Sequence, residues 1–290
     1  MVSLRVSELP ESSFVLANGL RLHYLEWGEA DGRPIVLNHA TGFLARLWEP
    51  VARELASAGY RVLAYDARGH GDSEKPEATL ENYDWHRAVD DLRGFLDVMG
   101  LRDVPFVGHS FGGAVGLFLA GTQPGYLSRV VAIEPIVMPG GFTPDERRRN
   151  DMAAAARRRR HVFSSAEEMI AQYRSRPTFA KWTEETLRLY VEEGTFVRDD
   201  GQIELKCSGE IEGALFANSG GLPVWDVLPK IEVPVLVMRG ETTDGFLAMA
   251  AEAVAGRAPD GRLETIALAG HLAPMERPEA VAQMILGALV

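Results

Sequence analysis

The chain has 290 residues, of which 46% are hydrophobic and 24% charged, and its formal net charge is −11. This balance is typical of a globular protein and excludes intrinsic disorder. The negative charge disfavours binding to nucleic acid or to an anionic membrane. The one cysteine, Cys207, excludes an internal disulfide and a multi-cysteine metal site. The opening residues lack an apolar signal segment, and no apolar run reaches membrane-spanning length, so we expect a soluble, cytoplasmic protein.

Short apolar runs alternate with amphipathic stretches through much of the chain, a pattern typical of βαβ units on a mainly parallel sheet. The Asn18-Gly19 pair predicts a tight hairpin turn between the first two strands. In chain order, the predicted strands are Ser13–Ala17, Leu20–Trp27, Pro34–Asn38, Tyr60–Tyr65, Val104–Val107, Arg129–Ile133, Val233–Met238 and Leu263–Leu268. The predicted helices of this part are Trp48–Ala58, Tyr83–Val98, Ser110–Gly121 and Pro278–Leu289.

The strand pattern stops in the segment 137–228. This segment contains helical patterns at Ala153–Arg160, Ala166–Arg174 and Glu184–Glu193, with no convincing buried strand. We therefore interpret the chain as one α/β core, formed by residues 1–136 and 229–290, that is interrupted by a helical insertion at 137–228. No internal repeat or low-complexity linker is present.

The sequence Gly108-His-Ser-Phe-Gly112 follows a predicted strand and opens a predicted helix. A serine on so sharp a bend projects its hydroxyl away from the backbone. The bend crowds the positions two before and two after the serine, and both of these are glycine. We therefore predict that Ser110 is a nucleophile.

In this motif and four others the chain resembles the serine hydrolases of the α/β-hydrolase fold, and the resemblance covers nearly all of it. The other matching pieces are His39-Ala-Thr-Gly-Phe43, Asp66-Ala-Arg-Gly-His-Gly-Asp-Ser73, Arg239-Gly-Glu-Thr-Thr-Asp244 and Ala269-Gly-His-Leu-Ala-Pro274. The resemblance implies a mostly parallel central sheet flanked by helices, with a helical cap, or lid, inserted after the sixth strand. It also implies a carboxylesterase-like serine hydrolase that needs no cofactor.

A serine hydroxyl needs a neighbouring base to accept its proton, and seven histidines are available. We select His271 because it lies in a glycine-led loop just past the last predicted strand, at the carboxyl edge of the sheet. It also completes the order serine, acid, histidine that is expected for this fold.

The third catalytic residue is a carboxylate that orients the imidazole. Asp244 is the predicted acid, because it follows the strand Val233–Met238 and precedes the histidine. Many relatives carry the acid one position earlier, where this chain has Thr243. Glu134, at the end of another strand, is the alternative, since part of the superfamily carries its acid there. Glu241 is a third and weaker candidate.

The oxyanion formed on attack requires backbone N–H donors, which we assign to Thr41 and Phe111. Apolar residues that would contact a substrate are Phe43, Trp48, Met138 and Trp225, with Phe142 a further candidate. No metal-binding or dinucleotide-binding motif is present, so we expect neither a metal nor a cofactor.

These patterns favour hydrolysis of small or medium carboxylic esters through an acyl-serine intermediate. A lactonase, a carbon–carbon bond hydrolase and a perhydrolase would use the same residues, and a non-catalytic receptor of this fold is the alternative from another class. The serine nucleophile argues against epoxide hydrolases and haloalkane dehalogenases, which use a carboxylate.

Two arginine runs, Arg147–Arg149 and Arg157–Arg160, fit a solvated helix face. They also suggest a cationic mouth for carboxylated esters such as half-esters of diacids. The oligomeric state is left open.

Overall fold

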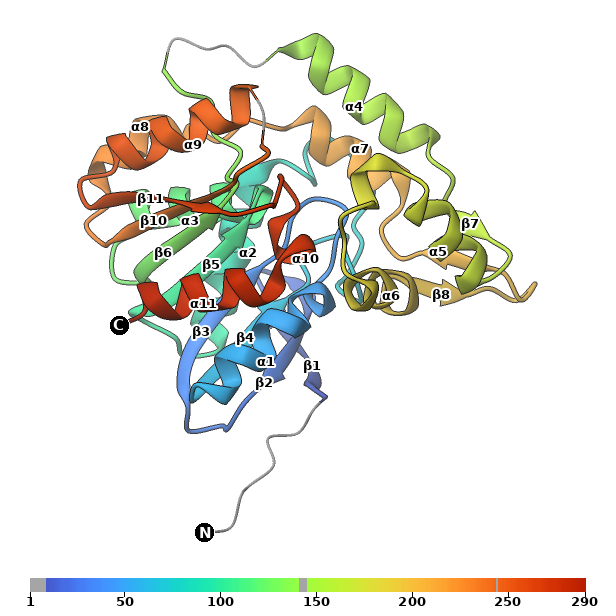
Figure 1. Cartoon of the computed structure of the whole chain (residues 1–290), viewed down its shortest axis with the longest axis horizontal. Helices are drawn as coiled ribbons and strands as arrows, with labels where there is room; N and C mark the ends of the chain where they lie inside the picture. The colour runs from blue at the N-terminus through green and yellow to red at the C-terminus, as the bar shows by residue number, and fades with distance from the viewer. Residues whose placement is uncertain (1–8, 141–144, 244) are drawn as a thin grey trace.

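The computed structural model describes residues 9–140, 145–243 and 245–290, and its main feature is an eight-stranded sheet (Figure 1). The strand order is β1-β2-β4-β3-β5-β6-β10-β11. The β1–β2 and β2–β4 pairs are antiparallel and all the others are parallel. The bounds of these strands are β1 (Glu11–Ala17), β2 (Leu20–Trp27), β3 (Arg33–Asn38), β4 (Tyr60–Tyr65), β5 (Val104–His109), β6 (Leu127–Ile133), β10 (Val235–Gly240) and β11 (Gly261–Ile266). This is the predicted mostly parallel α/β sheet.

Helices cover both faces of the sheet because successive strand side chains point to opposite sides. On β3, for example, Ile35 and Leu37 join the apolar cluster beneath one layer of helices, whereas Val36 joins the cluster on the other face. The first layer contains α1 (Glu49–Ser57) and α11 (Pro278–Ala288), which Figure 1 shows in front of the sheet. The second contains α2 (Trp85–Val98), α3 (Phe111–Thr122) and α9 (Gly245–Arg257). Short helices complete the core at η1 (Ala45–Trp48), η3 (Leu228–Lys230) and α10 (Ala273–Glu276).

The segment that connects β6 to β10 contains what we call the insertion (residues 137–228). Its residues 146–217 lie together at one end of the sheet, whereas residues 224–227 pack on α3 (Figure 1). Its elements are α4 (Glu146–Arg158), β7 (Val162–Phe163), α5 (Ala166–Arg174), η2 (Pro177–Phe179), α6 (Glu184–Glu193), β8 (Thr195–Val197), β9 (Ile203–Leu205), α7 (Gly209–Ala217) and α8 (Val224–Val227). An apolar cluster that includes Tyr173, Trp182 and Tyr190 fills it. Leu47 and Met275 of the core join that cluster, so the insertion packs directly on the core.

The structure differs from the sequence prediction in several elements, of which the following affect the insertion and the helix layers most. The insertion is not purely helical, because β7, β9 and β8 form a small antiparallel sheet. Strands of two or three residues are too short to show an alternating pattern. The first helix of the insertion begins at Glu146, earlier than predicted, because the side chain of Asp145 accepts the Arg148 amide and caps it. The helix α9 was not predicted, since its small and apolar residues give no clear amphipathic contrast.

The helices in the described ranges were also compared with the requirements of a membrane span, and none of them is both long and apolar enough.

Candidate active site

Ser110 occupies the sharp turn between β5 and α3, with φ 54° and ψ −109°. A Cβ on Gly108 would lie 2.3 Å from the carbonyl oxygen of Gly112, and a Cβ on Gly112 would lie 2.6 Å from that of Asn38. Both separations are far below van der Waals contact, so only glycine fits at either position. The Ser110 amide donates to the carbonyl of Ile133 at 2.8 Å, which ties the turn to the neighbouring strand β6. The local sequence therefore fixes an unusual backbone that holds the hydroxyl clear of the sheet.

His271, in the loop after β11, lies beside this serine although 161 residues separate them in the chain. Its Nε2 is 3.1 Å from Ser110 Oγ, which is within hydrogen-bond distance for proton transfer. The buried His109 donates from Nε2 to the carbonyl oxygen of His271 at 2.7 Å. This bond anchors the backbone of the His271 loop to the end of β5.

Among the described residues, the carboxylate that faces His271 is Glu134, which directly follows β6. Its Oε2 lies 3.2 Å from His271 Nδ1, and its side chain is fully buried. Its Oε1 accepts the Gly240 amide at 2.6 Å and also the hydroxyl of Thr243. Glu134 has φ 50°, a left-handed backbone conformation that is uncommon outside glycine. The tertiary structure thus holds this acid in place by two hydrogen bonds from the loop after β10.

Of the other two carboxylates that the sequence offered, the structure describes only Glu241, which has a different partner. Asp244, the predicted acid, lies outside the described residues. Glu241 accepts the amide of Leu268 at 2.8 Å and so supports the turn after β11. The position that relatives commonly use for the acid is Thr243, and here its hydroxyl donates to Glu134.

Thr41 and Phe111, the predicted oxyanion donors, lie in the loop after β3 and at the start of α3. Thr41 lies in the loop between β3 and η1, and lines the same cavity as Ser110 and His271. Phe111 is the first residue of α3, so its amide has no acceptor within the helix. The Thr41 amide makes no hydrogen bond with another residue in the part of the chain described by the structure. Both N–H groups are therefore available to a developing negative charge.

Two buried histidines support the loop that carries Thr41. His70 donates from Nδ1 to the Arg68 carbonyl, which leaves Nε2 free to accept the Gly42 amide at 3.0 Å. His39 donates from Nδ1 to the Ala40 carbonyl at 2.8 Å. The loop geometry thus depends on neutral imidazoles. We did not identify this role for His70 from the sequence, because only the fold shows which backbone group each ring nitrogen meets.

Burial keeps the imidazoles of His70 and His109 neutral and makes the stability of the fold sensitive to acid. Burial lowers the pKa of His70 and of His109 to about 3 in each case. In the unfolded chain both would titrate near about 6.5. Below that pH the unfolded state binds more protons, so each histidine lowers the free energy of unfolding by about 1.4 kcal/mol per pH unit until its folded pKa is reached.

We therefore expect the free energy of unfolding to be steady above about pH 7.5 and to fall steeply between pH 6.5 and 4.5. Urea denaturation at successive pH values measures it. His70→Gln should reduce the slope, whereas substitution of the exposed His161 should leave it unchanged. A flat profile across this range would show that the histidines are protonated in the folded protein.

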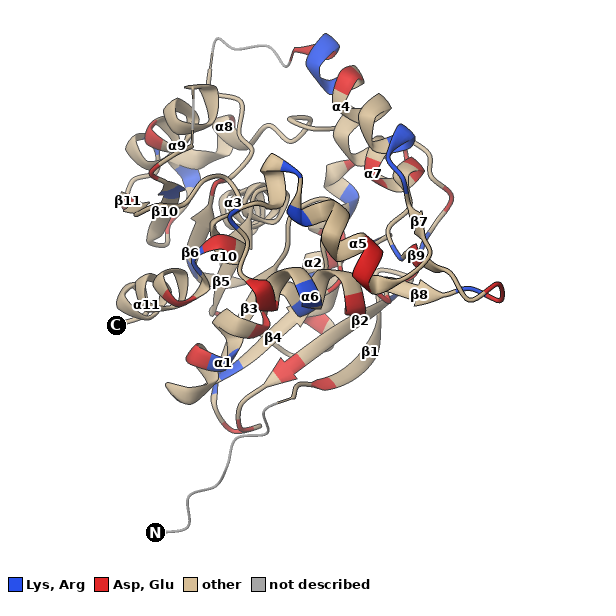
Figure 2. Cartoon of the chain, turned by 45° about the vertical axis from the view of Figure 1, so that its right-hand side comes forward, with Lys and Arg blue, Asp and Glu red and all other residues tan. Residues whose placement is uncertain are grey.

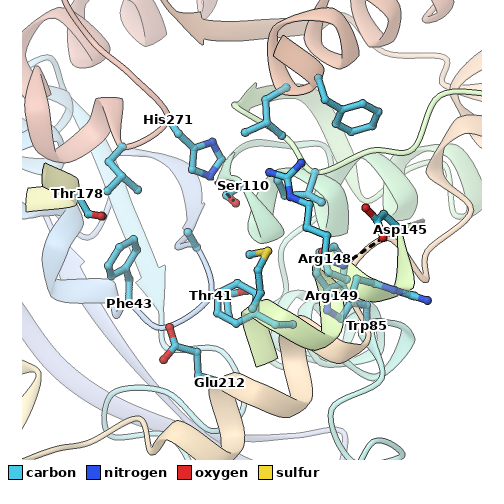
Figure 3. A pocket seen from close by; sticks show the side chains of 18 of the residues that line it. Thr41, Phe43, Trp85, Ser110, Asp145, Arg148, Arg149, Thr178, Glu212 and His271 are labelled. Atoms are coloured by element: carbon cyan, nitrogen blue, oxygen red, sulfur yellow. Dashed lines mark hydrogen bonds between the residues drawn. The ribbon is translucent and has the colours of Figure 1, made fainter. Parts of the chain in front are cut away.

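A cavity of about 630 Å³ opens beside the serine and is bounded by both the core and the insertion (Figure 3). Ser110 and His271 form part of its wall, together with Thr41. Of the predicted substrate contacts, Phe43 and Met138 line the cavity. The volume is in the range of small-molecule sites.

Trp48 and Trp225, which the sequence predicted as substrate contacts, do not line this cavity in the described structure. Trp48 is 2% exposed and packs in the apolar cluster between the sheet and α1. The ring of Trp225 is covered by the guanidinium of Arg257, 4.4 Å from the ring centroid, and a Cβ on Gly140 would lie 2.4 Å from its Nε1. Phe142 lies outside the described residues.

The predicted arginine run 157–160 is largely neutralised by glutamates of the insertion. Arg157 Nε lies 3.2 Å from Glu210, and Arg160 lies 2.6 Å from Glu168. Neither arginine lines the described cavity wall, whereas Arg159 does. Figure 2 shows further basic residues at the start of α4, with acidic residues beside them.

His23, Asp66 and Asp72 are the group of described residues whose ligand atoms come close enough, within 4.8 Å, to hold a metal ion. Asp66 already accepts the amides of Ala45 and Asp72, at 2.6 and 2.9 Å, and lies 2.7 Å from His23 Nδ1. Its oxygens are thus engaged in organising the loop after β4. This arrangement fits a structural role rather than a metal centre.

The fold and the serine–histidine–glutamate arrangement define a hydrolase of the α/β class. A family model described as "Alpha/beta hydrolase family" matches residues 14–284. The chain belongs to this family.

Individual relatives vary in their named activities. The chain is 43% identical over 106 residues to "Epoxide hydrolase A" of Mycobacterium tuberculosis, in an alignment covering 37% of this chain and 33% of that protein. It is 33% identical over 133 residues to "Non-heme chloroperoxidase" of Streptomyces lividans, covering 44% and 47% respectively. The matches thus span between a third and a half of these relatives. Among solved structures, E-2-(acetamidomethylene)succinate hydrolase superposes with a TM-score of 0.82 over 97% of this chain and 99% of that one, at 23% identity.

Proposed function

We propose that the protein is a serine hydrolase that cleaves carboxylic esters of small or medium size. The observation that carries this proposal is the continuous contact from Ser110 Oγ through His271 to the buried carboxylate of Glu134. A non-catalytic receptor would have no need of this relay. The structure of an esterase from Thermogutta terrifontis, superposed with a TM-score of 0.73 at 25% identity over 96% of this chain and 98% of that one, is consistent with the proposal.

In the acylation step Ser110 Oγ attacks the ester carbonyl carbon and His271 Nε2 accepts the hydroxyl proton. His271 then carries a proton on each ring nitrogen, and Glu134 accepts the hydrogen bond from Nδ1 and stabilises the positive charge. The amides of Thr41 and Phe111 stabilise the oxyanion. Collapse of the tetrahedral intermediate breaks the bond to the alcohol oxygen, which takes the proton from His271.

In the deacylation step a water molecule gives a proton to His271 and attacks the acyl carbon of the ester formed with Ser110. The second tetrahedral intermediate uses the same amide donors. Its collapse releases the carboxylic acid, and the proton returns from His271 to Ser110 Oγ. No cofactor enters either step.

We further propose that the insertion acts as the cap of this site. Residues of the insertion, including Met152, Tyr190 and Phe216, form the wall of the cavity opposite the sheet. A substrate in the cavity would therefore contact the core at its scissile bond and the insertion along its acyl or alcohol chain.

A fluorophosphonate probe tests the proposed nucleophile directly. We expect one adduct, mapped by mass spectrometry to the peptide that contains Ser110, and competition of labelling by 4-nitrophenyl butyrate. His271→Ala should slow labelling strongly, because the serine loses its base. A folded protein that takes up no probe and releases no nitrophenolate would refute the proposal, as would an adduct on another serine.

A further inference from the structure

The wall of the cavity formed by α4 and the residue that follows it carries three arginines in an otherwise largely apolar lining. They are Arg148, Arg149 and Arg159. Figure 3 shows Arg148 and Arg149 on the side of the cavity across from Phe43 and Thr178. Three cations in one wall are unexpected in a protein whose net charge is −11. Their partners decide whether this charge is already balanced.

Arg159 is balanced within the protein. Its Nε lies 2.9 Å from the largely buried Glu212, and its Nη2 donates to the carbonyl of Cys207 at 3.1 Å. Its Nη1 also reaches the hydroxyl of Tyr190 at 3.4 Å. Arg159 therefore fastens α4 to α7 and to α6, and its charge is satisfied without a ligand.

Arg148 and Arg149 have no close carboxylate partner in the described structure; Arg148 is exposed and Arg149 is half-buried. The guanidinium of Arg148 has neither an ion pair nor a hydrogen bond with another described residue, and only its backbone amide is engaged, by Asp145. The Nε of Arg149 is buried and has no hydrogen-bond acceptor among the described residues. Its Nη2 lies 3.9 Å from Glu146, a side chain that is 84% exposed. A buried donor that lacks an acceptor is unfavourable unless a ligand or water supplies one.

Both carboxylates of the described cavity wall, Asp145 and Glu212, already have partners within the protein. Glu212 pairs with Arg159, and Asp145 caps α4. Apolar side chains of Ile136, Met138 and Met152 complete this part of the wall. The cavity wall thus contains the proposed nucleophile Ser110, the guanidinium groups of Arg148 and Arg149, and apolar surface.

We propose that Arg148 and Arg149 form a subsite for a carboxylate group of the substrate. The inference rests on the proposed ester hydrolysis and defines its substrate class as esters with a carboxylate separated from the scissile bond by an apolar chain. Guanidinium groups match this anion because they donate paired hydrogen bonds to its two oxygens. The same subsite offsets the repulsion that the acidic protein exerts on an anion. Arg157 and Arg160, by contrast, are paired with glutamates and do not line the described cavity.

The test compares two esters that differ only in charge: mono-4-nitrophenyl adipate and the corresponding primary amide, 4-nitrophenyl 5-carbamoylpentanoate. We expect wild-type kcat/KM to favour the carboxylate, and Arg148→Gln/Arg149→Gln to reduce that preference roughly 10- to 100-fold through a raised KM. The control variant Arg157→Gln/Arg160→Gln removes the same charge from the same region and should keep the preference. Thermal unfolding shows that both variants are folded.

A binding measurement separates this proposal from the proposed function. Calorimetry with the Ser110→Ala variant measures the affinity of the same two esters without turnover. Tighter binding of the carboxylate that is lost in the Arg148→Gln/Arg149→Gln background supports the subsite, even if the wild type hydrolyses neither ester and the ester hydrolase proposal fails. Equal affinity for the two esters, or equal loss in the control variant, overturns the subsite even if both esters are hydrolysed.

Discussion

Ser110→Ala is expected to lower kcat for 4-nitrophenyl butyrate by about 10⁵- to 10⁶-fold. The reason is that no acyl-enzyme forms without Oγ, so the activated leaving group meets only water and the remaining amide donors. The loss should be in kcat rather than in KM, since the alanine leaves the cavity wall otherwise intact. Steady-state rates corrected for spontaneous hydrolysis provide the measurement.

The double variant Ser110→Ala/His271→Ala shows whether the two residues act as one unit. We expect it to be no slower than Ser110→Ala, because a base without a nucleophile contributes little. Ser175→Ala, which removes an exposed hydroxyl on the insertion, should retain wild-type rates. Substantial residual kcat in Ser110→Ala, above that of the double variant, would instead point to another nucleophile or to direct attack by water.

Glu134→Gln is expected to lower kcat by about 10³- to 10⁴-fold, the loss seen when the acid of such a triad becomes an amide. The amide carries no charge to stabilise the His271 imidazolium. The amide also has an NH₂ donor where the carboxylate of Glu134 has an acceptor. The carboxylate, by contrast, accepts hydrogen bonds from His271 and also from Gly240 and Thr243. The rate should be followed across pH, with thermal unfolding as the check on folding.

The matched variant is Asp244→Asn, which makes the same chemical change at the acid position that the sequence favoured. We expect it to change kcat by less than about threefold. The two variants together discriminate between the acids: a large loss in Asp244→Asn with a small one in Glu134→Gln would assign the role to Asp244. Comparable losses in both would show that the histidine depends on two carboxylates.

The local sequence was sufficient to predict those features that depend on residues close together in the chain. The glycines at 108 and 112 indicated the sharp turn at Ser110, since a Cβ at either would collide with backbone. The alternation of apolar runs with amphipathic stretches indicated a sheet whose strands alternate with helices along the chain. The long helix α2 was evident because its apolar residues recur at helical spacing.

The sequence was less informative where an element is short or compositionally uniform. The small sheet of the insertion consists of strands of two and three residues, and α9 is made largely of alanine and other apolar residues. Neither gives the periodic contrast on which pattern reading depends. The aromatic residues Trp48 and Trp225 suit a ligand pocket as well as they suit packing, and only their neighbours in space distinguish the two roles.

By itself, then, the sequence determined the family resemblance, and it predicted a nucleophile, a histidine and a short choice of acids, because these follow from residue type and chain order. The tertiary structure brought Glu134 to His271: β6 ends beside β10, so the Glu134 carboxylate contacts both the hydroxyl of Thr243 and the imidazole. It also decided which arginines of the insertion have a close glutamate partner and which line the cavity without one. Both outcomes depend on how close in space two residues lie when they are far apart in the chain. Charge and hydrogen bonding depend on this spatial distance and not on the number of residues between the partners.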